Sequence, residues 1–285
     1  MPSQYPIHIG HSPDPDDAFM FYGMLHGKVD LQGLEIKEVV EDIESLNERA
    51  LEGVIEATAV SWHLLATISE KYAVLDPGAS MGIGYGPVLV AKGGQRIPFP
   101  DLGGRRVALP GPHTTATLLM RILATNFKEV FVPFDRIMGE VEAGAVDAGL
   151  LIHEGQITYG EEGFEKVADY GEIWADLTDG LPLPLGTNAV RRDLPKGVDA
   201  RLARVLLDSI VWGEENRAET NAYAREFGRG LDEEKNDRFI KMYVNPFTLS
   251  LGEEGVEGVD RLFQIAGDKG VLPRRVNWKR VMPVS

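Results

Sequence analysis

The chain has 285 residues, of which 44% are hydrophobic and 26% charged, and its formal net charge is −15. These proportions are typical of a globular protein, and the length allows one large domain or two ordinary ones. No window approaches the roughly 18 to 20 consecutive apolar residues of a membrane helix. The negative charge argues against nucleic acid as a partner, because that affinity rests on lysine and arginine neutralising phosphates. A small anion would have to be met by local amides, hydroxyls or a few cations.

The N-terminal segment and the absence of cysteine bear on the compartment. Residues 1–17 show no basic region followed by an apolar run, so they do not indicate a secretory signal. Zero cysteines exclude disulfides, thiolate catalysis and thiolate metal sites, and they fit a reducing compartment. We therefore expect a cytoplasmic protein.

Short apolar runs alternate with amphipathic stretches along the first half of the chain, a pattern typical of parallel βαβ units. The first group consists of strand 6–10, helix 16–27, strand 34–40, helix 42–53 and strand 55–61. The second group consists of strand 105–111, helix 114–127, strand 129–134, helix 135–144 and strand 146–152. Each group predicts a small doubly wound sheet.

The two groups are related by an internal similarity at their ends. Residues 50–63 align with residues 141–154, which matches Gly53 with Gly144 and Ala57 with Ala148. Each copy has an acidic helical stretch that ends at glycine, then an apolar run that closes on polar or ionisable side chains. Ser61 lies one place before Trp62, the residue opposite His153.

The remaining segments complete a two-lobed α/β protein. Residues 84–94 predict a strand, 95–104 a crossover, 179–195 a proline- and glycine-rich return, and residues from about 199 onward helices. We predict a first lobe from 1–92 plus 186–285 and a second lobe from 93–185. Ligands of open α/β sheets bind at the carboxyl ends of the strands, so a cleft between the lobes is the expected site.

His153 is the first candidate for chemistry, because it follows the apolar run 146–152. Proton transfer near neutral pH is the obvious use of an imidazole at a strand end in a cleft. A hydrogen-bonded histidine without a chemical role explains the same pattern, and such histidines outnumber catalytic ones. The residues alone leave both interpretations open.

Segment 109–123, LPGPHTTATLLMRIL, joins a Gly-Pro turn to an apolar helix. One of His113, Thr114 and Thr115 is expected to cap this helix. A helix start offers unpaired N–H groups and the positive end of the dipole, so Thr115 and nearby amides are candidates to hold a carboxylate or phosphate. An ordinary cap without a ligand is the alternative.

Segment 10–23, GHSPDPDDAFMFYG, is the densest polar run in the chain. A metal site from His11 and the acids at 14, 16 and 17 is disfavoured, because the prolines constrain the loop and the spacing matches no calcium or zinc pattern. Asp16 or Asp17 would instead cap the next helix and stabilise its first turn. Ser61 is a further candidate, as a hydrogen-bond donor to a ligand, but no G-x-S-x-G elbow surrounds it.

Three motifs together resemble a known family. HSPDPDDAFMFYGMLHG (11–27), LPGPHTTATLL (109–119) and LLIHEGQITY (150–159) are similar to motifs of the 1,4-dihydroxy-6-naphthoate synthases of the futalosine route to menaquinone. The resemblance covers most of the chain. It implies an α/β, two-lobed fold like the type II periplasmic binding proteins, with a ligand cleft between the lobes.

The resemblance also implies an activity. The chain would be a cytoplasmic carbon–carbon lyase that converts cyclic dehypoxanthine futalosine to 1,4-dihydroxy-6-naphthoate and dihydroxyacetone. No metal or organic cofactor is implied; the partner is a small anionic aromatic substrate, with no nucleic acid or membrane, and the protein is a monomer or homodimer. His153 matches the catalytic base of the family, while Ser61, Thr114, Thr115, Ala116 and Asp17 match substrate-binding positions.

One motif departs from the family. The usual Ser-Pro-Cys-Pro-Asn-Asp-Thr-Phe reads Ser-Pro-Asp-Pro-Asp-Asp-Ala-Phe here, so Asp14 replaces cysteine, Asp16 replaces asparagine and Ala18 replaces threonine. If the two added carboxylates face the cleft, they would repel an anionic substrate, or one of them would be protonated. The alternatives to the naphthoate enzyme are a solute-binding protein for a small carboxylate and the related chorismate dehydratase.

Overall fold

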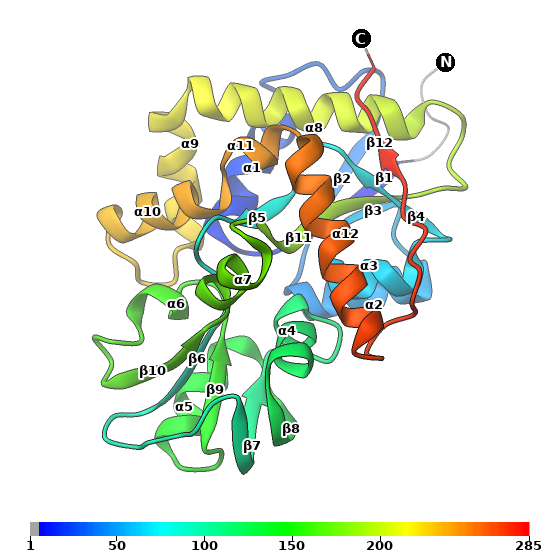
Figure 1. The fold of residues 1–285 in the computed structure, drawn as a ribbon. Helices are drawn as coiled ribbons and strands as arrows, with labels where there is room; N and C mark the ends of the chain where they lie inside the picture. The colour runs from blue at the N-terminus through cyan, green and yellow to red at the C-terminus, as the bar shows by residue number, and fades with distance from the viewer. Residues whose placement is uncertain (1–5, 285) are drawn as a thin grey trace. The chain divides into compact units, whose positions relative to one another are not determined.

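The computed structural model describes residues 6–284 and contains two β-sheets with helices packed against them (Figure 1). Residues 1–5 lie outside this range. They belong to the segment 1–17, for which the sequence predicted no secretory signal. Among the described residues, contacts define two compact units. Unit 1 comprises residues 6–81, 186–256 and 276–284, and unit 2 comprises residues 82–185 and 257–275. Within residues 6–284 no helix has the length and apolar character needed to cross a membrane.

The first predicted βαβ group is confirmed in unit 1. Its elements are β1 (Ile7–His11), α1 (Pro15–Leu25), β2 (Ile36–Val40), α2 (Ile43–Glu52) and β3 (Ala57–Ser61). Strand β1 lies between β2 and β3 and pairs with both in parallel. Asp42 caps α2 by accepting the backbone N–H of Glu44 and Ser45, and Gly53 ends the helix in the left-handed conformation.

The second predicted group is confirmed in unit 2 with the same strand order. It consists of β7 (Asp101–Leu109), α4 (Thr115–Leu123), β8 (Thr125–Phe131), α5 (Ile137–Glu142) and β9 (Ala148–Leu151). Strand β7 lies between β8 and β9 and pairs with both in parallel. The predicted helix 114–127 ends early, because its last residues join β8 beside β7. The internal similarity therefore reflects two copies of one supersecondary unit.

Each sheet also receives one antiparallel strand from the chain that follows the other copy. Strand β6 (Val88–Lys92) pairs with β9, and β11 (Leu183–Arg191) pairs with β3 and β4 (Tyr72–Leu75). The segment 179–195, which was predicted to carry the chain back, contains β11, a strand that the sequence did not predict. Proline does not prevent this, because pairing with β3 begins only at Gly186, after Pro184.

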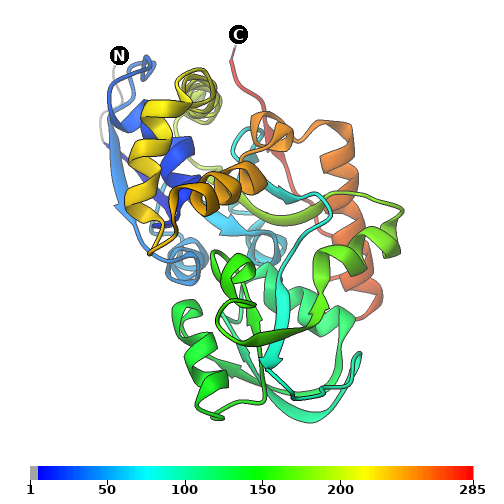
Figure 2. The same ribbon diagram turned by 90° about the vertical axis from the view of Figure 1, so that its left-hand side faces the viewer.

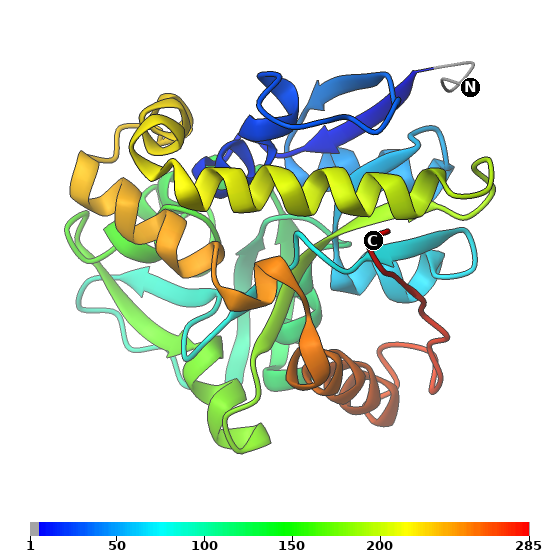
Figure 3. The same ribbon diagram turned by 90° about the horizontal axis from the view of Figure 1, so that it is seen from above.

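The C-terminal part is helical, as predicted, and packs largely on α1. Helix α8 (Val198–Glu215) contacts α1, as Figure 3 shows, and α9 (Arg217–Ala224) lies beside α1 in Figure 2. The apolar core between them includes Phe19, Phe21 and Leu206. The other helices of this part are η2 (Arg225–Phe227), α10 (Glu233–Tyr243), α11 (Pro246–Leu249) and α12 (Gly252–Asp268), followed by β12 (Arg280–Val281).

Shorter elements connect these parts: α3 (Trp62–Ile68), β5 (Ser80–Gly82), η1 (Phe134–Arg136), α6 (Gly155–Thr158), β10 (Phe164–Asp169) and α7 (Tyr170–Thr178). The compact units and the predicted lobes assign two segments differently. Residues 82–92 and 257–275 belong to unit 2 by their contacts, whereas the predicted first lobe contains both. The lobe boundaries and the ligand cleft stay predictions.

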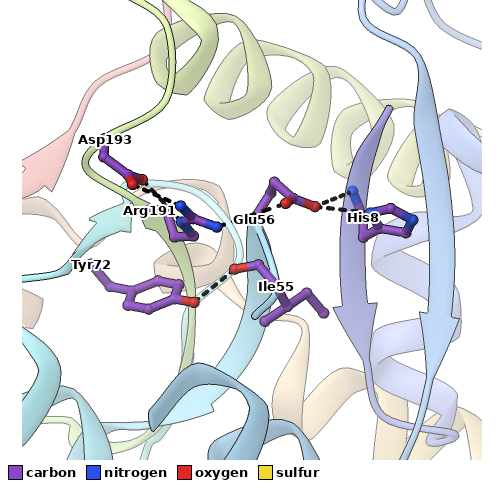
Figure 4. Close-up of polar contacts among 6 residues, drawn as sticks. All are labelled: His8, Ile55, Glu56, Tyr72, Arg191 and Asp193. Atoms are coloured by element: carbon purple, nitrogen blue, oxygen red, sulfur yellow. Dashed lines mark hydrogen bonds and ion pairs between the residues drawn. The ribbon is translucent and has the colours of Figure 1, made fainter. Parts of the chain in front are cut away.

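The amino-terminal edge of the unit 1 sheet is held by side chains from neighbouring strands (Figure 4). The backbone N–H and Nδ1 of His8 lie 3.0 and 2.9 Å from Glu56 Oε2. Arg191 at the end of β11 approaches the same carboxylate at 3.9 Å. The Tyr72 hydroxyl donates to the Ile55 carbonyl at 2.7 Å, and burial raises the pKa of Tyr72 to about 12. These contacts fix strand order at the edge opposite the candidate residues.

Candidate functional site

The candidate residues of unit 1 gather at the carboxyl edge of its sheet. Strands β1 and β3 are adjacent and parallel, and they end at His11 and Ser61. Residues 12–17, called the acidic motif below, follow β1 and run into helix α1, which begins at Pro15. Ser61 and Asp17 were predicted as binding residues from separate motifs, and the parallel pairing of β1 with β3 explains why they share one edge.

Ser61 is buried and is held by Asn47 of helix α2. The Ser61 backbone N–H donates to Asn47 Oδ1 at 3.0 Å, and Asn47 Nδ2 donates to Ser61 Oγ at 3.1 Å. A hydroxyl that accepts through a lone pair keeps its proton for donation. Asn47 therefore fixes Ser61 in an orientation that suits a hydrogen-bond donor. Sequence reasoning missed Asn47, although an amide on the apolar face of an amphipathic helix was a usable signal.

Asp17 forms two hydrogen bonds with Ser12, within the same acidic motif. Its Oδ2 accepts both the backbone N–H and the hydroxyl of Ser12, each at 2.7 Å. Burial raises the pKa of Asp17, while the nearby His11 ring and the two Ser12 donors oppose that rise. Asp16 and Asp17 lie in the first turn of α1, as predicted, but the predicted cap was wrong: the N-cap is Asp14, and its side chain makes no cap hydrogen bond.

Asp14 is buried and pairs with an arginine far along the chain. Arg229 Nη1 donates to Asp14 Oδ1 at 2.7 Å, and Nη2 donates to the Pro13 carbonyl at 3.0 Å. Arg229 follows η2 and has a left-handed backbone, with φ of +41°. Nothing in the local sequence singled out Arg229, because its partner lies 215 positions away.

Asp16 is the third carboxyl group of this cluster and is also buried. Burial is the first cause that raises the pKa of Asp16 well above its usual range, and the charges of Asp17 and Asp14 raise it further. The two outcomes predicted for the added acids were repulsion of the substrate and protonation of one acid, and the raised pKa of Asp16 points toward the second. The ion pair of Asp14 with Arg229 was not predicted.

His11 completes the cluster beneath the loop. Its ring is fully buried and stacks on Phe21, with centroids 4.8 Å apart. Nδ1 lies 2.9 Å from the Ser12 carbonyl oxygen, and Nε2 lies 2.9 Å from Glu38 Oε1 on β2. Burial lowers the pKa of His11, but Glu38, Asp17 and the Ser12 carbonyl together outweigh this and raise it.

In unit 2 the predicted anion-binding segment starts helix α4, as expected. Thr114 is the N-cap, and its side chain accepts the backbone N–H of Thr117 at 3.3 Å. Ala116 is buried in the first turn, where backbone N–H groups have no partner within the helix. The Thr115 hydroxyl donates to the Leu185 carbonyl at 2.7 Å. Thr114 is therefore a structural cap, and the amides of the first turn present the positive end of the helix.

His153 lies in the turn between β9 and α6, at the carboxyl edge of the unit 2 sheet. The ring is partly buried and meets Phe134 edge-on, with centroids 4.7 Å apart and planes at 67°. Its backbone φ is +57°, in the left-handed region that non-glycine residues rarely adopt. Such backbone conformations cluster at functional sites because surrounding structure must hold them. Strand β9 pairs in parallel with β7, so His153 and the start of α4 share one edge.

Comparison with known proteins identifies the family. A family model described as menaquinone biosynthesis matches residues 7–268. A 1,4-dihydroxy-6-naphthoate synthase of Thermus thermophilus is 40% identical over 265 residues, which cover 93% of this chain and 95% of the relative. The chain belongs to the menaquinone biosynthesis family. Another member, a synthase of the same name from Streptomyces coelicolor, is 35% identical over 94% of this chain and 95% of its own length.

Solved structures define the fold. A crystal structure of an Archaeoglobus fulgidus protein has a TM-score of 0.89 and 46% identity, covering 95% of this chain and all of that one. The alkanesulfonate-binding protein SsuA of Xanthomonas axonopodis has a TM-score of 0.70 at 15% identity, covering 95% of each chain. This menaquinone biosynthesis family member thus has the predicted periplasmic-binding-protein-like α/β fold.

Proposed function

We propose that the chain is a 1,4-dihydroxy-6-naphthoate synthase, a carbon–carbon lyase. It would convert cyclic dehypoxanthine futalosine to 1,4-dihydroxy-6-naphthoate and dihydroxyacetone. The observation that carries the proposal is 40% identity over 93% of the chain to a relative of that name. The left-handed backbone of His153, at the end of a buried strand, supports the presence of a reactive group.

His153 is the proposed catalytic base. A neutral imidazole removes the proton that starts ring opening and fragmentation, and the resulting imidazolium returns a proton to the leaving fragment. Phe134 packs against the ring edge-on and restricts its rotation. The strained backbone and this aromatic contact would hold the ring in one orientation, which proton transfer requires.

The start of α4 is the proposed carboxylate site. The backbone N–H groups of Thr115 and Ala116 belong to the first turn, where an anion gains from both hydrogen bonds and the helix dipole. The Thr115 hydroxyl would exchange the Leu185 carbonyl for the carboxylate when substrate binds, because one hydroxyl proton serves one strong acceptor. Thr114, as the N-cap, holds the first turn that carries these N–H groups and the Thr115 hydroxyl.

Ser61 and Asp17 are further proposed substrate-binding residues. Ser61 would donate its hydroxyl proton to an oxygen of the substrate while Asn47 holds the Oγ atom. Asp17 would contribute through Ser12, whose N–H and hydroxyl it binds. Both residues lie at the carboxyl edge of their sheet, where open α/β sheets bind ligands.

The test is incubation of the purified protein with cyclic dehypoxanthine futalosine, followed by mass spectrometry of the products. The naphthoate and dihydroxyacetone are expected in equal amounts from the wild-type protein and at background from His153→Gln. Calorimetry with the same compound separates two failures. Binding without any product would support a solute-binding role, whereas neither binding nor product would exclude this substrate.

The cytoplasm is the proposed place of action. A chain without cysteine fits a reducing compartment, and a biosynthetic substrate derived from a nucleoside would be made there. Cell fractionation followed by immunoblotting against a known cytoplasmic marker tests this, and recovery in the periplasmic fraction would contradict it.

A further inference from the structure

The acidic motif of unit 1 combines three buried carboxyl groups within four positions. Asp14, Asp16 and Asp17 are 1%, 7% and 7% exposed. All three acids lie in a segment that is proposed to contact an anionic substrate. Buried carboxylates need partners, since leaving water is costly for an unpaired charge. Two of the surrounding side chains, Arg229 and His11, can supply positive charge to these carboxylates.

Arg229 supplies the first positive charge. Its two Nη atoms reach both the Asp14 carboxylate and the neighbouring Pro13 carbonyl, so the guanidinium binds the loop at two points. The residue lies between Gly228 and Gly230 with φ of +41°, a conformation that non-glycine residues adopt at an energetic cost. The Asp14 side chain is 2% exposed and that of Arg229 is 27% exposed. Removing one partner of such a pair costs more than it does on the surface, because it leaves a buried charge without that partner.

His11 supplies the second positive charge. The ring nitrogens face the Ser12 carbonyl oxygen and a Glu38 carboxylate oxygen, both at 2.9 Å. Neither a carbonyl nor an ionised carboxylate can donate, so both contacts are hydrogen bonds only when both nitrogens carry protons. Asp17, whose charge raises the pKa of His11, faces the ring from α1.

We propose that Arg229 and a doubly protonated His11 are the counter-ions that allow the acidic motif at residues 12–17 to receive an anionic substrate. Both are positioning residues, because they act through the loop. The proposal rests on the proposed function for its substrate, but not for the charge states themselves. Arg229 pairs with Asp14. His11 pairs directly with Glu38, and its charge also favours the ionised form of Asp17. Asp16, when protonated, is a neutral hydrogen-bond donor and acceptor.

A pair of neutral substitutions and their combination test the role of Arg229. Arg229→Gln removes the positive charge that pairs with Asp14 and should raise KM for the anionic substrate by about tenfold or more. Asp14→Asn leaves Arg229 with excess positive charge and should lower KM or leave it unchanged. The double variant should recover most of the loss seen in Arg229→Gln. A purely structural pair would instead raise KM in both single variants, and that result would overturn the proposal.

Nitrogen-15 NMR of the histidine rings tests the charge of His11 without any substrate. At pH 7 both His11 nitrogens should carry protons, and the signals should vanish in His11→Gln. His8→Gln is the matched control, because His8 also faces a glutamate but is exposed at the opposite sheet edge. A neutral His11 ring at pH 7 would overturn this part of the proposal.

The pH dependence of the melting temperature provides a second measurement without substrate. The groups facing His11 are Glu38 from β2 and Asp17 from α1, with Asp14, Asp16 and Arg229 around the same loop. Its raised pKa means that its stabilisation is complete below pH 6.5 and is lost as pH rises through the folded-state value. The melting temperature of His11→Gln should therefore fall less than that of wild type over this range. An identical slope would contradict the charged ring, even if the futalosine derivative is not the substrate.

Discussion

Asn47 and Ser61 are joined by two hydrogen bonds that link helix α2 to the end of strand β3. The amide accepts the Ser61 N–H at 3.0 Å and donates to the Ser61 hydroxyl at 3.1 Å, and Asn47 is fully buried. Asn47→Ala should lower the free energy of unfolding by about 1 to 3 kcal/mol, because it leaves a buried N–H without its acceptor. Urea denaturation measures this. Leu51→Ala on the exposed face of α2 is the control, and an equal loss there would contradict the specific role of Asn47.

The His153 side chain is predicted to affect turnover rather than binding. His153→Gln should reduce kcat by about 10²- to 10⁴-fold, the range typical of a lost general base, with KM changed little. Steady-state kinetics on cyclic dehypoxanthine futalosine measure both constants. His8→Gln should keep wild-type kinetics, since His8 lies at the opposite edge of its sheet. Retained kcat in His153→Gln would remove the residue from the chemistry.

The Thr115 hydroxyl is predicted to contribute to substrate affinity. Thr115→Val should raise KM about tenfold, the equivalent of one charge-assisted hydrogen bond, and should cost about 1 kcal/mol of stability through the lost Leu185 contact. Thr178→Val is a matched control, because the Thr178 hydroxyl donates to the Trp174 carbonyl at the same 2.7 Å distance. It should show a similar stability loss with unchanged KM. If both variants have the wild-type KM, Thr115 does not contact substrate.

The ionisation of Asp16 is predicted to make the stability of the protein depend on pH. Its pKa is raised above 3.8 by burial, so the stability linked to its proton is present below that value and lost as pH rises through the folded-state pKa. Asp16→Asn should therefore make the protein more stable than the wild type at pH 8, because the variant buries no charge at this position. Below pH 4 the difference should disappear. Thermal melts of the wild type and Asp16→Asn between pH 4 and pH 8 test this prediction. A difference in melting temperature that stays constant across the range would indicate a cause other than ionisation.

Tyr72 is predicted to act on stability alone. Tyr72→Phe removes the hydroxyl that donates to the Ile55 carbonyl and should cost about 1 kcal/mol, with kcat and KM unchanged. Urea denaturation and steady-state kinetics together test this. A change in KM would show that the amino-terminal edge of the sheet influences the substrate site.

The order of strands and helices was predictable from the sequence, because it depends on local periodicity. The apolar runs at 6–10, 55–61 and 146–152 all became strands, and the segment 114–123 became a capped helix. The internal similarity of 50–63 to 141–154 also predicted two equivalent units. The motifs that resemble the family contain His153, Thr115 and Asp17, so the candidate residues were within reach of sequence reasoning as well.

Long-range pairing decided the rest. Strand β11 was missed because its proline and glycine content describes an irregular segment, and only its neighbours β3 and β4 make it a strand. The charge states of the acidic motif were equally out of reach. Asp14 looked like an added repulsive charge until the fold placed Arg229 beside it, and His11 gained Glu38 only through the pairing of β1 with β2. Local sequence sets which groups can ionise, but the tertiary structure decides which do, because ionisation depends on burial and on partners remote in sequence.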